Sequence, residues 1–219
     1  QKLTAISLFA EVNKRMLSDK GPYLHNSPKD SRVVVLFTMG LTHKFRGELG
    51  AADKALSDAA TLAQERGNVH IVGVAFGHLA SIQAIQGHLH QAVQTCQRGL
   101  RLVREMAGRR SPLSGLLQAE LGNLLYEQND LEAARHHLRE GIAVAKPWGF
   151  WEALAPGYTG LARVRVVQRD WQGAFAALDE LAAIGQNNPE AVMPAVESFR
   201  AMLWAAQGEV DAAQPSRSS

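Results

Sequence analysis

The chain has 219 residues, 46% of them hydrophobic and 20% charged, which is a globular rather than a disordered composition. Lys and Arg total 23 against 21 Asp and Glu, so no strong overall field attracts nucleic acid or a membrane surface. The single cysteine, Cys96, excludes an intramolecular disulfide framework, and no apolar run approaches the roughly 20 residues that span a bilayer. We therefore expect a cytoplasmic protein and, because the chain begins with Gln1 rather than Met, a fragment of a longer one.

All predicted elements are helices, because apolar residues recur at intervals of three or four throughout the chain. The β-branched run at 33–35 is assigned to a helix as well. The expected helices cover residues 3–17, 31–46, 48–66, 69–86, 88–107, 112–128, 130–146, 150–168, 170–184 and 190–207. We expect a polar loop after the first of them, so that 1–30 forms a helix and loop, 31–213 the main domain, and 214–219 a disordered tail. The last helix is expected to turn at Gly208, which leaves its partner unfinished.

An internal repeat organises these helices. Alanines at positions 52, 92, 134, 174 and 213 lie 39 to 42 residues apart, and each has the same surroundings. The residue twelve positions before each alanine is small, and the residue five positions before it lies at the corner. In the first four units, the residue four positions after the alanine is apolar. The corner residues are Gly47, Gly87, Asn129, Arg169 and Gly208, and the small residues are Gly40, Ala80, Gly122, Ala162 and Ala201. A helix hairpin cannot bury its apolar face alone, so the repeat predicts an all-α superhelical array of stacked antiparallel helix pairs.

This pattern resembles the tetratricopeptide repeat (TPR), with a period near 40 residues rather than 34. The segments LGNLLYEQNDLEAARHHLREGIAVAKPWGF and GYTGLARVRVVQRDWQGAFAALDEL are similar to the helical-repeat domain of large MalT-like regulators of the LuxR family. The resemblance covers about 33–209. It implies an array that lies between a nucleotide-binding ATPase module and a helix-turn-helix, and that relays the binding of an effector or partner protein to them. This chain contains neither a G-x-x-x-x-G-K-[ST] motif nor a recognisable DNA-reading helix pair, so those activities are not assigned to it.

The resemblance also implies where a ligand binds. In tetratricopeptide arrays the first helix of each pair lines a concave groove. The resemblance assigns the groove positions of that repeat to the matching positions of the repeat in this chain. The predicted ligand-binding residues are Phe37, Leu41, Lys44, Ser81, Asn123, Tyr126, Thr159 and Arg163, with Gly77, Ala84, Ala119 and Val166 beside them. Their donors and one aromatic ring suit a polar or anionic small molecule or a peptide. The alternative is that they are ordinary solvated side chains.

Other conspicuous residues are expected to be structural. The aromatic cluster Trp148, Phe150, Trp151 and Tyr158 is predicted to plug the junction between repeats, with a ligand-stacking wall as the alternative. The histidines near Cys96, such as His88 and His90, diverge on their helix, so we predict no metal site and a buried Cys96. Arg98, Arg101 and Arg104, followed by Arg109 and Arg110, are predicted to form a solvated helix face. The alternative is a patch for phosphate, nucleic acid or an acidic partner.

No catalytic constellation stands out, since titratable residues are scattered rather than clustered, so we predict neither an enzyme nor a cofactor. Two function hypotheses remain. The first is an effector-sensing module of a MalT-like regulator, working with the other modules of its parent protein. The second is a scaffold that binds a partner protein and has no small-molecule ligand, with dimerisation through the array ends as a variant.

Overall fold

The computed structural model describes residues 28–187 and 189–213, and the predicted helix at 3–17, the loop after it up to residue 27 and the tail at 214–219 lie outside them. The described residues are helical and contain no strand. The α-helices are α2 (Pro28–Arg46), α3 (Leu49–Glu65), α4 (Val69–Ile85), α5 (Leu89–Ala107), α6 (Pro112–Glu127), α7 (Leu131–Ala145), α8 (Trp151–Val167), α9 (Trp171–Ile184) and α10 (Pro189–Ala213), and two 3₁₀ turns are η1 (Lys146–Trp148) and η2 (Gly185–Asn187). None of the described helices is long and apolar enough to cross a membrane.

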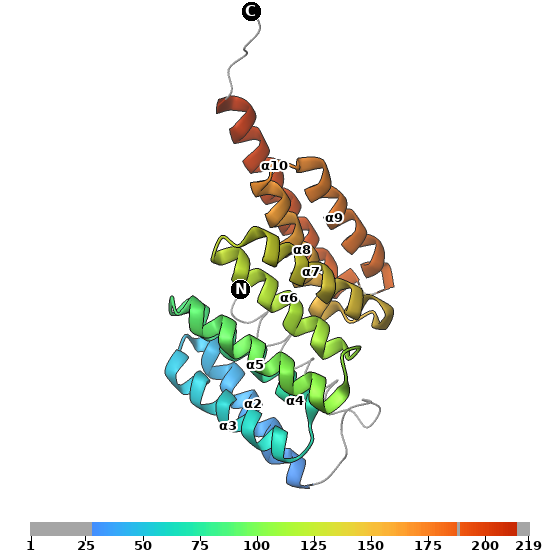
Figure 1. Ribbon diagram of the computed structural model, residues 1–219. Coiled ribbons are helices and arrows are strands. Elements are labelled where there is room, and N and C mark those ends of the chain that lie inside the picture. The colour runs from blue at the N-terminus through green and yellow to red at the C-terminus, as the bar shows by residue number, and fades with distance from the viewer. Residues whose placement is uncertain (1–27, 188, 214–219) are drawn as a thin grey trace, which may run out of the picture.

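The helices stack as the predicted array of antiparallel pairs (Figure 1). Each pair consists of a first helix and a second helix: α2 with α3, α4 with α5, α6 with α7, and α8 with α9. Each second helix also packs against the first helix of the next pair. In addition, α4 packs on α6 and α6 packs on α8, so the first helices form a continuous layer. We call the surface of this layer the inner face.

The corners within the four complete pairs are made as the repeat predicts. The corner residue has a positive φ in each of them: 78° at Gly47, 83° at Gly87, 62° at Asn129 and 61° at Arg169. This left-handed conformation lets the chain reverse between two helices, and glycine and asparagine adopt it readily. Arg169 is the exception, since an arginine carries a steric cost there. The predicted corner residues are therefore confirmed at these four positions.

Small residues set the distance between the helices of a pair. A Cβ added to Gly40 would lie 2.6 Å from Leu56 Cγ, and a Cβ added to Gly122 would lie 2.6 Å from Leu138 Cγ. Both leucines are completely buried. Each glycine stands at the predicted small position of its unit, and each leucine stands at the predicted apolar position. The contact between these two positions confirms the repeat register.

The predicted turn at Gly208 is wrong, because α10 continues through this residue to Ala213. A glycine inside a helix costs only about 1 kcal/mol relative to alanine. It therefore ends a helix only where the chain beyond it is better packed as a second helix. The first four corners have such a packed helix among the described residues, whereas α10 packs on α8 and α9 and projects beyond them (Figure 1).

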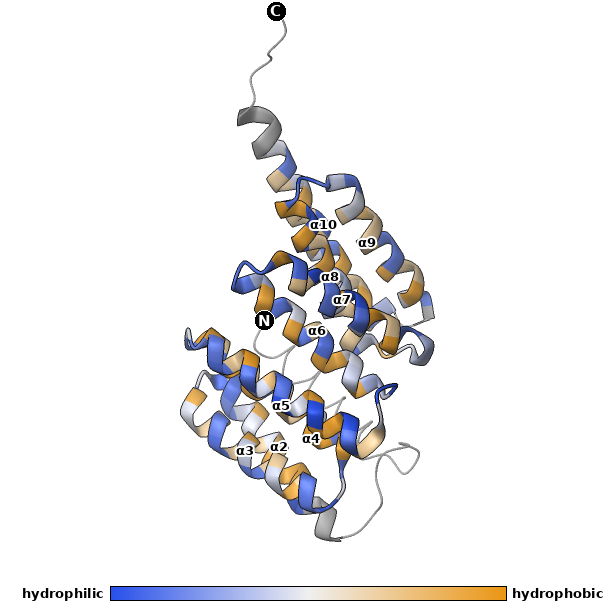
Figure 2. Cartoon of the chain, in the orientation of Figure 1, coloured by the Kyte–Doolittle hydropathy of each residue, from blue (hydrophilic) through white to orange (hydrophobic). Residues whose placement is uncertain are grey.

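The core runs along the array between the helices. Hydrophobic residues recur along the helices, with hydrophilic residues between them (Figure 2). The second helix α5 is buried on one side, whereas the first helices α4 and α6 are buried over most of their surface. Phe150 packs against both large groups of buried residues, Trp151 packs against the second, and Tyr158 is 2% exposed within it. These three confirm the predicted plug between repeats. Trp148 does not take part in it, because the η1 turn leaves this side chain 61% exposed.

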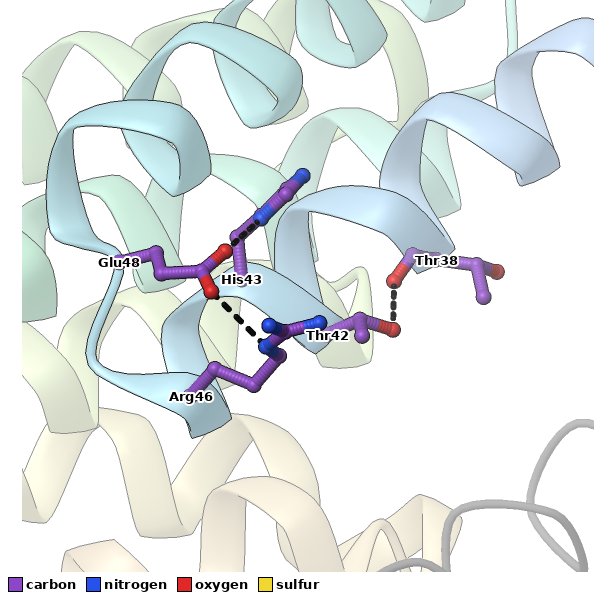
Figure 3. A network of polar contacts seen from close by, with 5 residues as sticks. All are labelled: Thr38, Thr42, His43, Arg46 and Glu48. Atoms are coloured by element: carbon purple, nitrogen blue, oxygen red, sulfur yellow. Dashed lines mark hydrogen bonds and ion pairs between the residues drawn. The ribbon is translucent and has the colours of Figure 1, made fainter.

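A polar network closes the first corner (Figure 3). Glu48, at the start of α3, accepts from two residues at the end of α2: its Oε2 lies 2.5 Å from His43 Nδ1 and its Oε1 lies 2.8 Å from Arg46 Nε. One turn earlier, Thr42 Oγ1 donates to the carbonyl oxygen of Thr38 at 2.9 Å. The hydrogen bond from His43, reinforced by the charge of Arg46, lowers the pKa of Glu48. The network links the two helices of the first pair at the solvent-exposed end of their corner.

Candidate functional site

The eight predicted ligand-binding residues lie on four successive first helices, but their surroundings differ. Phe37 and Thr159 are 4% and 7% exposed, and Leu41 packs against the core. These three side chains contribute mainly to the contacts between helices, and their role in ligand binding stays a prediction. The other five divide into two separate clusters.

The first cluster centres on Lys44 of α2. Its ammonium donates a hydrogen bond to Ser81 Oγ at 2.9 Å and lies 3.3 Å from His78 Nδ1, and both partners belong to α4. The ring of Phe37 is tilted toward that of His78, with the ring centroids 6.0 Å apart. Lys44 therefore bridges the first two pairs across the inner face. We call Lys44, His78, Ser81 and Glu120 of α6 the inner polar cluster.

Glu120 joins this cluster through its charge. Burial raises the pKa of Glu120, and the positive charge of Lys44 opposes that shift. The effect is mutual, since burial lowers the pKa of Lys44 and the charge of Glu120 opposes it. No ion pair of the described residues joins the two side chains, so they interact through space. The α4 backbone passes beside Glu120 at Gly77, where an added Cβ would be 3.9 Å from Glu120 Cγ.

His78 is neutral at pH 7. Burial and the charge of Lys44 together lower its pKa to about 4. A neutral imidazole can accept a hydrogen bond at Nδ1 from the Lys44 ammonium, with its proton carried on Nε2. The cluster thus presents an ammonium group, an imidazole, a hydroxyl and a carboxyl group on three adjacent helices.

In the second cluster, Arg163 and Asn123 form their polar contacts with other groups of the protein. Arg163 of α8 is held 2.5 Å from Glu127 Oε1 of α6, and its guanidinium lies 4.1 Å from the centroid of the Tyr126 ring. Asn123 Nδ2 donates to two carbonyl oxygens, those of Ala119 at 3.1 Å and Pro156 at 3.2 Å. Both amide hydrogens of Asn123 are therefore used within the protein. This cluster joins α6 to α8 and offers a ligand fewer unused groups than the inner polar cluster does.

Sequence reasoning missed His78 and Glu120. Each lies three residues, one helical turn, before a predicted position: Ser81 in α4 and Asn123 in α6. Glu120 is also one of only two charged residues in α6. A titratable residue one helical turn from a predicted inner-face position is the sequence feature by which His78 and Glu120 could have been identified.

Cys96 lies in the core, as its position in the repeat predicts. Cys96 is fully buried, donates to the carbonyl oxygen of Leu117 at 3.2 Å, and has its pKa raised by burial. A buried thiol with a raised pKa is a poor nucleophile and a poor metal ligand. Within residues 28–187 and 189–213, no group of three or more His, Cys, Asp or Glu side chains could hold a metal ion.

Comparison with known proteins identifies this arrangement. The family model described as the MalT-like TPR region matches residues 22–218. No curated protein matches the chain. Among solved structures, BtubC (BKLC) from P. vanneervenii is similar over 100% of this chain and 78% of its own, with a TM-score of 0.57 and 18% identity. The putative kinesin light chain TPR-like repeats of Podosopora anserina are similar over 84% of this chain and 98% of their own, with a TM-score of 0.55 and 15% identity. These likenesses establish the fold of a TPR-like α-solenoid.

Proposed function

Because the chain belongs to the family of MalT-like TPR regions, we propose that it is the effector-binding module of a MalT-like LuxR-family transcription regulator. The effector is a small polar molecule that binds on the inner face at Lys44, His78, Ser81 and Glu120. Binding is relayed to ATPase and DNA-binding modules of the parent regulator.

One observation carries the proposal: Lys44 and Glu120, which carry opposite charges, are both half-buried on the inner face without pairing directly. Removing a charge from water costs several kcal/mol unless hydrogen bonds or an opposite charge offset the cost. Ser81 and His78 satisfy part of the hydrogen-bonding capacity of the Lys44 ammonium group. The carboxyl group of Glu120 interacts with the charge of Lys44 through space. A ligand that offers an acceptor to Lys44 and a donor to Glu120 would complete both sets of interactions.

The position of the cluster also suits a relay. Lys44, Ser81 and Glu120 come from α2, α4 and α6, so one ligand would contact three consecutive pairs. A ligand shifts a conformational equilibrium by the difference in its affinity for the two states. An array in which these three first helices lie closer together would bind such a ligand better, so binding would favour the more tightly curved form.

The test is a thermal-shift screen of the protein against sugars, organic acids, aromatic metabolites and nucleotides. A ligand at 100 times its Kd adds about 2.7 kcal/mol to the stability, which raises the Tm of a domain of this size by roughly 5–11 °C. Lys44→Met and Glu120→Gln should each remove the response. Lys54→Met and Glu65→Gln change exposed residues of α3 in the same way and should retain it. A response that persists in both inner-face variants would place the effector elsewhere.

The second candidate function is a protein-binding scaffold, and the apolar surface of α10 favours it. Met202 and Trp204 are 61% and 62% exposed, and the Trp204 ring lies 5.9 Å from the ring of Phe175 in α9. Exposed aromatic side chains of this size are typical anchors of protein interfaces. If peptide display yields a ligand whose binding is lost in Trp204→Ser and kept in Lys44→Met, the scaffold function is supported instead.

A further inference from the structure

Five arginines lie on the outer surface of α5 and in the loop that follows it. Arg98, Arg101 and Arg104 are three residues apart, so successive side chains rise about 4.5 Å along the helix and step about 60° around it. Arg109 and Arg110 follow in the loop before α6. All except the half-buried Arg104 are exposed. We call these five residues the arginine face.

The arginine face lacks the carboxylate partners that five other arginines have, as do Arg32, Arg66, Arg139 and Arg169 among the described residues. In the described part of the chain, Arg46, Arg135, Arg163, Arg165 and Arg200 each lie within ion-pair distance of an Asp or Glu. Within that same part, none of the five residues of the arginine face takes part in such a pair. The nearest acid in the sequence is Glu105, an exposed residue on the same helix. The positive charge of this surface is therefore left for a partner.

Two of the arginines differ from freely solvated ones: Arg98 contacts an aromatic ring, and Arg104 is half-buried. The guanidinium of Arg98 lies 5.6 Å from the centroid of the Phe76 ring, which suits a cation–π contact. The Nε atom of Arg104 is buried and has no hydrogen-bond partner among the described residues. An ordered side chain loses less conformational entropy on binding than a free one, so the ring contact favours Arg98 as a binding residue. A free solvated arginine would show neither feature.

The charge of Arg104 acts on a histidine of α7. His137 Nδ1 of α7 lies 2.6 Å from Oε1 of the buried Gln118, which fixes the imidazole ring. Burial lowers the pKa of His137, with further lowering by His136 and Arg104, while Glu140 and Asp130 act in the opposite direction. The charge of Arg104 therefore reaches α7, where the carboxylates of Glu140 and Asp130 oppose its effect on His137.

We propose that the arginine face is a docking surface for an acidic segment of a partner protein, rich in Asp or Glu. The rise of about 4.5 Å between successive arginines matches carboxylates placed three or four residues apart on a helix. Bidentate pairing of guanidinium with carboxylate would then fix the partner on the outer surface. This surface is separate from the inner polar cluster, so the inference does not depend on the proposed effector site.

Charge distribution favours an acidic protein over nucleic acid. Duplex-binding proteins neutralise many phosphates, commonly six to ten, through a broad basic surface. Here the basic residues form one narrow stripe, interrupted by Glu105 and bordered by Glu140, in a chain whose net charge is only +2. A single helix-wide acidic segment fits a stripe of this width better than a duplex does.

The experiment measures binding of fluorescein-labelled octaglutamate to the whole chain by fluorescence anisotropy at low salt and at about 0.15 M salt. The triple variant Arg98→Gln, Arg101→Gln, Arg104→Gln should bind at least tenfold more weakly. A matched triple variant, Arg32→Gln, Lys54→Gln, Arg66→Gln, removes the same charge from other exposed positions and should change the Kd less than twofold. If Arg104→Gln disturbs folding, as judged by circular dichroism, the variant that carries only Arg98→Gln and Arg101→Gln replaces it, with an expected loss of at least threefold.

A parallel titration uses a labelled 16-base-pair DNA duplex. Octaglutamate binding that depends on the arginine face, with weaker binding of the duplex, supports the proposal. Equal losses in the arginine-face variant and the matched variant would overturn it, because they would show attraction by net charge alone. Absence of octaglutamate binding would overturn it as well. Tighter, arginine-dependent binding of the duplex would show a nucleic-acid surface instead.

Discussion

Replacing Gly122 with alanine tests whether the small residue of the repeat sets the spacing between helices. Gly122 lies where α6 crosses α7, and a Cβ there would be 2.6 Å from Leu138 Cγ and 3.0 Å from the carbonyl oxygen of Ala134. Leu138 is 0% exposed, so its side chain cannot move into solvent. The carbonyl oxygen belongs to the backbone of α7 and can retreat only if the helix moves. The added methyl group must therefore separate two packed helices.

The magnitude follows from two opposing contributions. Overpacking of a buried site typically costs 1–3 kcal/mol, and a clash that includes backbone belongs to the upper part of that range, at about 2–3 kcal/mol. Alanine is favoured over glycine inside a helix by about 1 kcal/mol. We therefore expect Gly122→Ala to lower the free energy of unfolding by about 1–2 kcal/mol, which corresponds to a decrease in Tm of roughly 2–8 °C.

Gly50→Ala is the matched control. Gly50 lies in α3 and is exposed, and a Cβ there would meet nothing within 4 Å. This variant has the benefit of alanine without the clash, so its stability should equal or slightly exceed that of the wild type. Urea titration followed by circular dichroism at 222 nm compares the two. If Gly122→Ala were stabilised as much as Gly50→Ala, close helix crossing at the small position would be refuted.

Four further outcomes follow from individual residues. Arg169→Gly should raise the free energy of unfolding by about 1 kcal/mol, because φ is 61° at this corner; a urea midpoint at or below that of the wild type would contradict this. His78 has its pKa lowered to about 4 by burial and by Lys44, so the unfolded chain binds a proton that the folded chain resists. Stability should fall as the pH drops from 6.5 to 4, by up to about 3 kcal/mol, and His78→Asn should flatten this part of the curve. Lys44→Met should raise the His78 pKa in an NMR titration, and an unchanged value would exclude their coupling. Asn123→Ala should cost about 1 kcal/mol, measured in urea, because the carbonyl oxygen of Pro156 loses a donor; an unchanged midpoint would remove the structural role of Asn123.

Local chemistry explains why the helix pairs could be predicted from the sequence. A corner needs a residue that tolerates positive φ, and Gly47, Gly87 and Asn129 are such residues. A close crossing needs a small residue opposite a large one, as at Gly122 and Leu138. Both requirements are met by residues at constant separations within one hairpin. The period of the array, its corners and most helix ends were therefore predictable.

Contacts between helix pairs determine the surroundings of the candidate site residues, which could not be predicted from the sequence. The environment of Lys44 depends on Glu120, 76 positions later in the chain, which reaches it only because α2, α4 and α6 lie side by side. Arg163 was predicted to be available to a ligand, yet α8 places it against Glu127 and Tyr126 of α6. Residue spacing within one repeat does not encode these pairings.

Asn129 and Gly208 show the same difference between what the sequence determines and what tertiary packing decides. The two occupy equivalent positions in the repeat, and glycine is the better of the two at positive φ. The chain nevertheless reverses at Asn129, where α7 packs against α6, and continues as helix through Gly208. The sequence by itself determined which residues permit a corner. Tertiary structure decided which corners form, because a helix gives up its own backbone hydrogen bonds only where packing against a second helix offsets the loss.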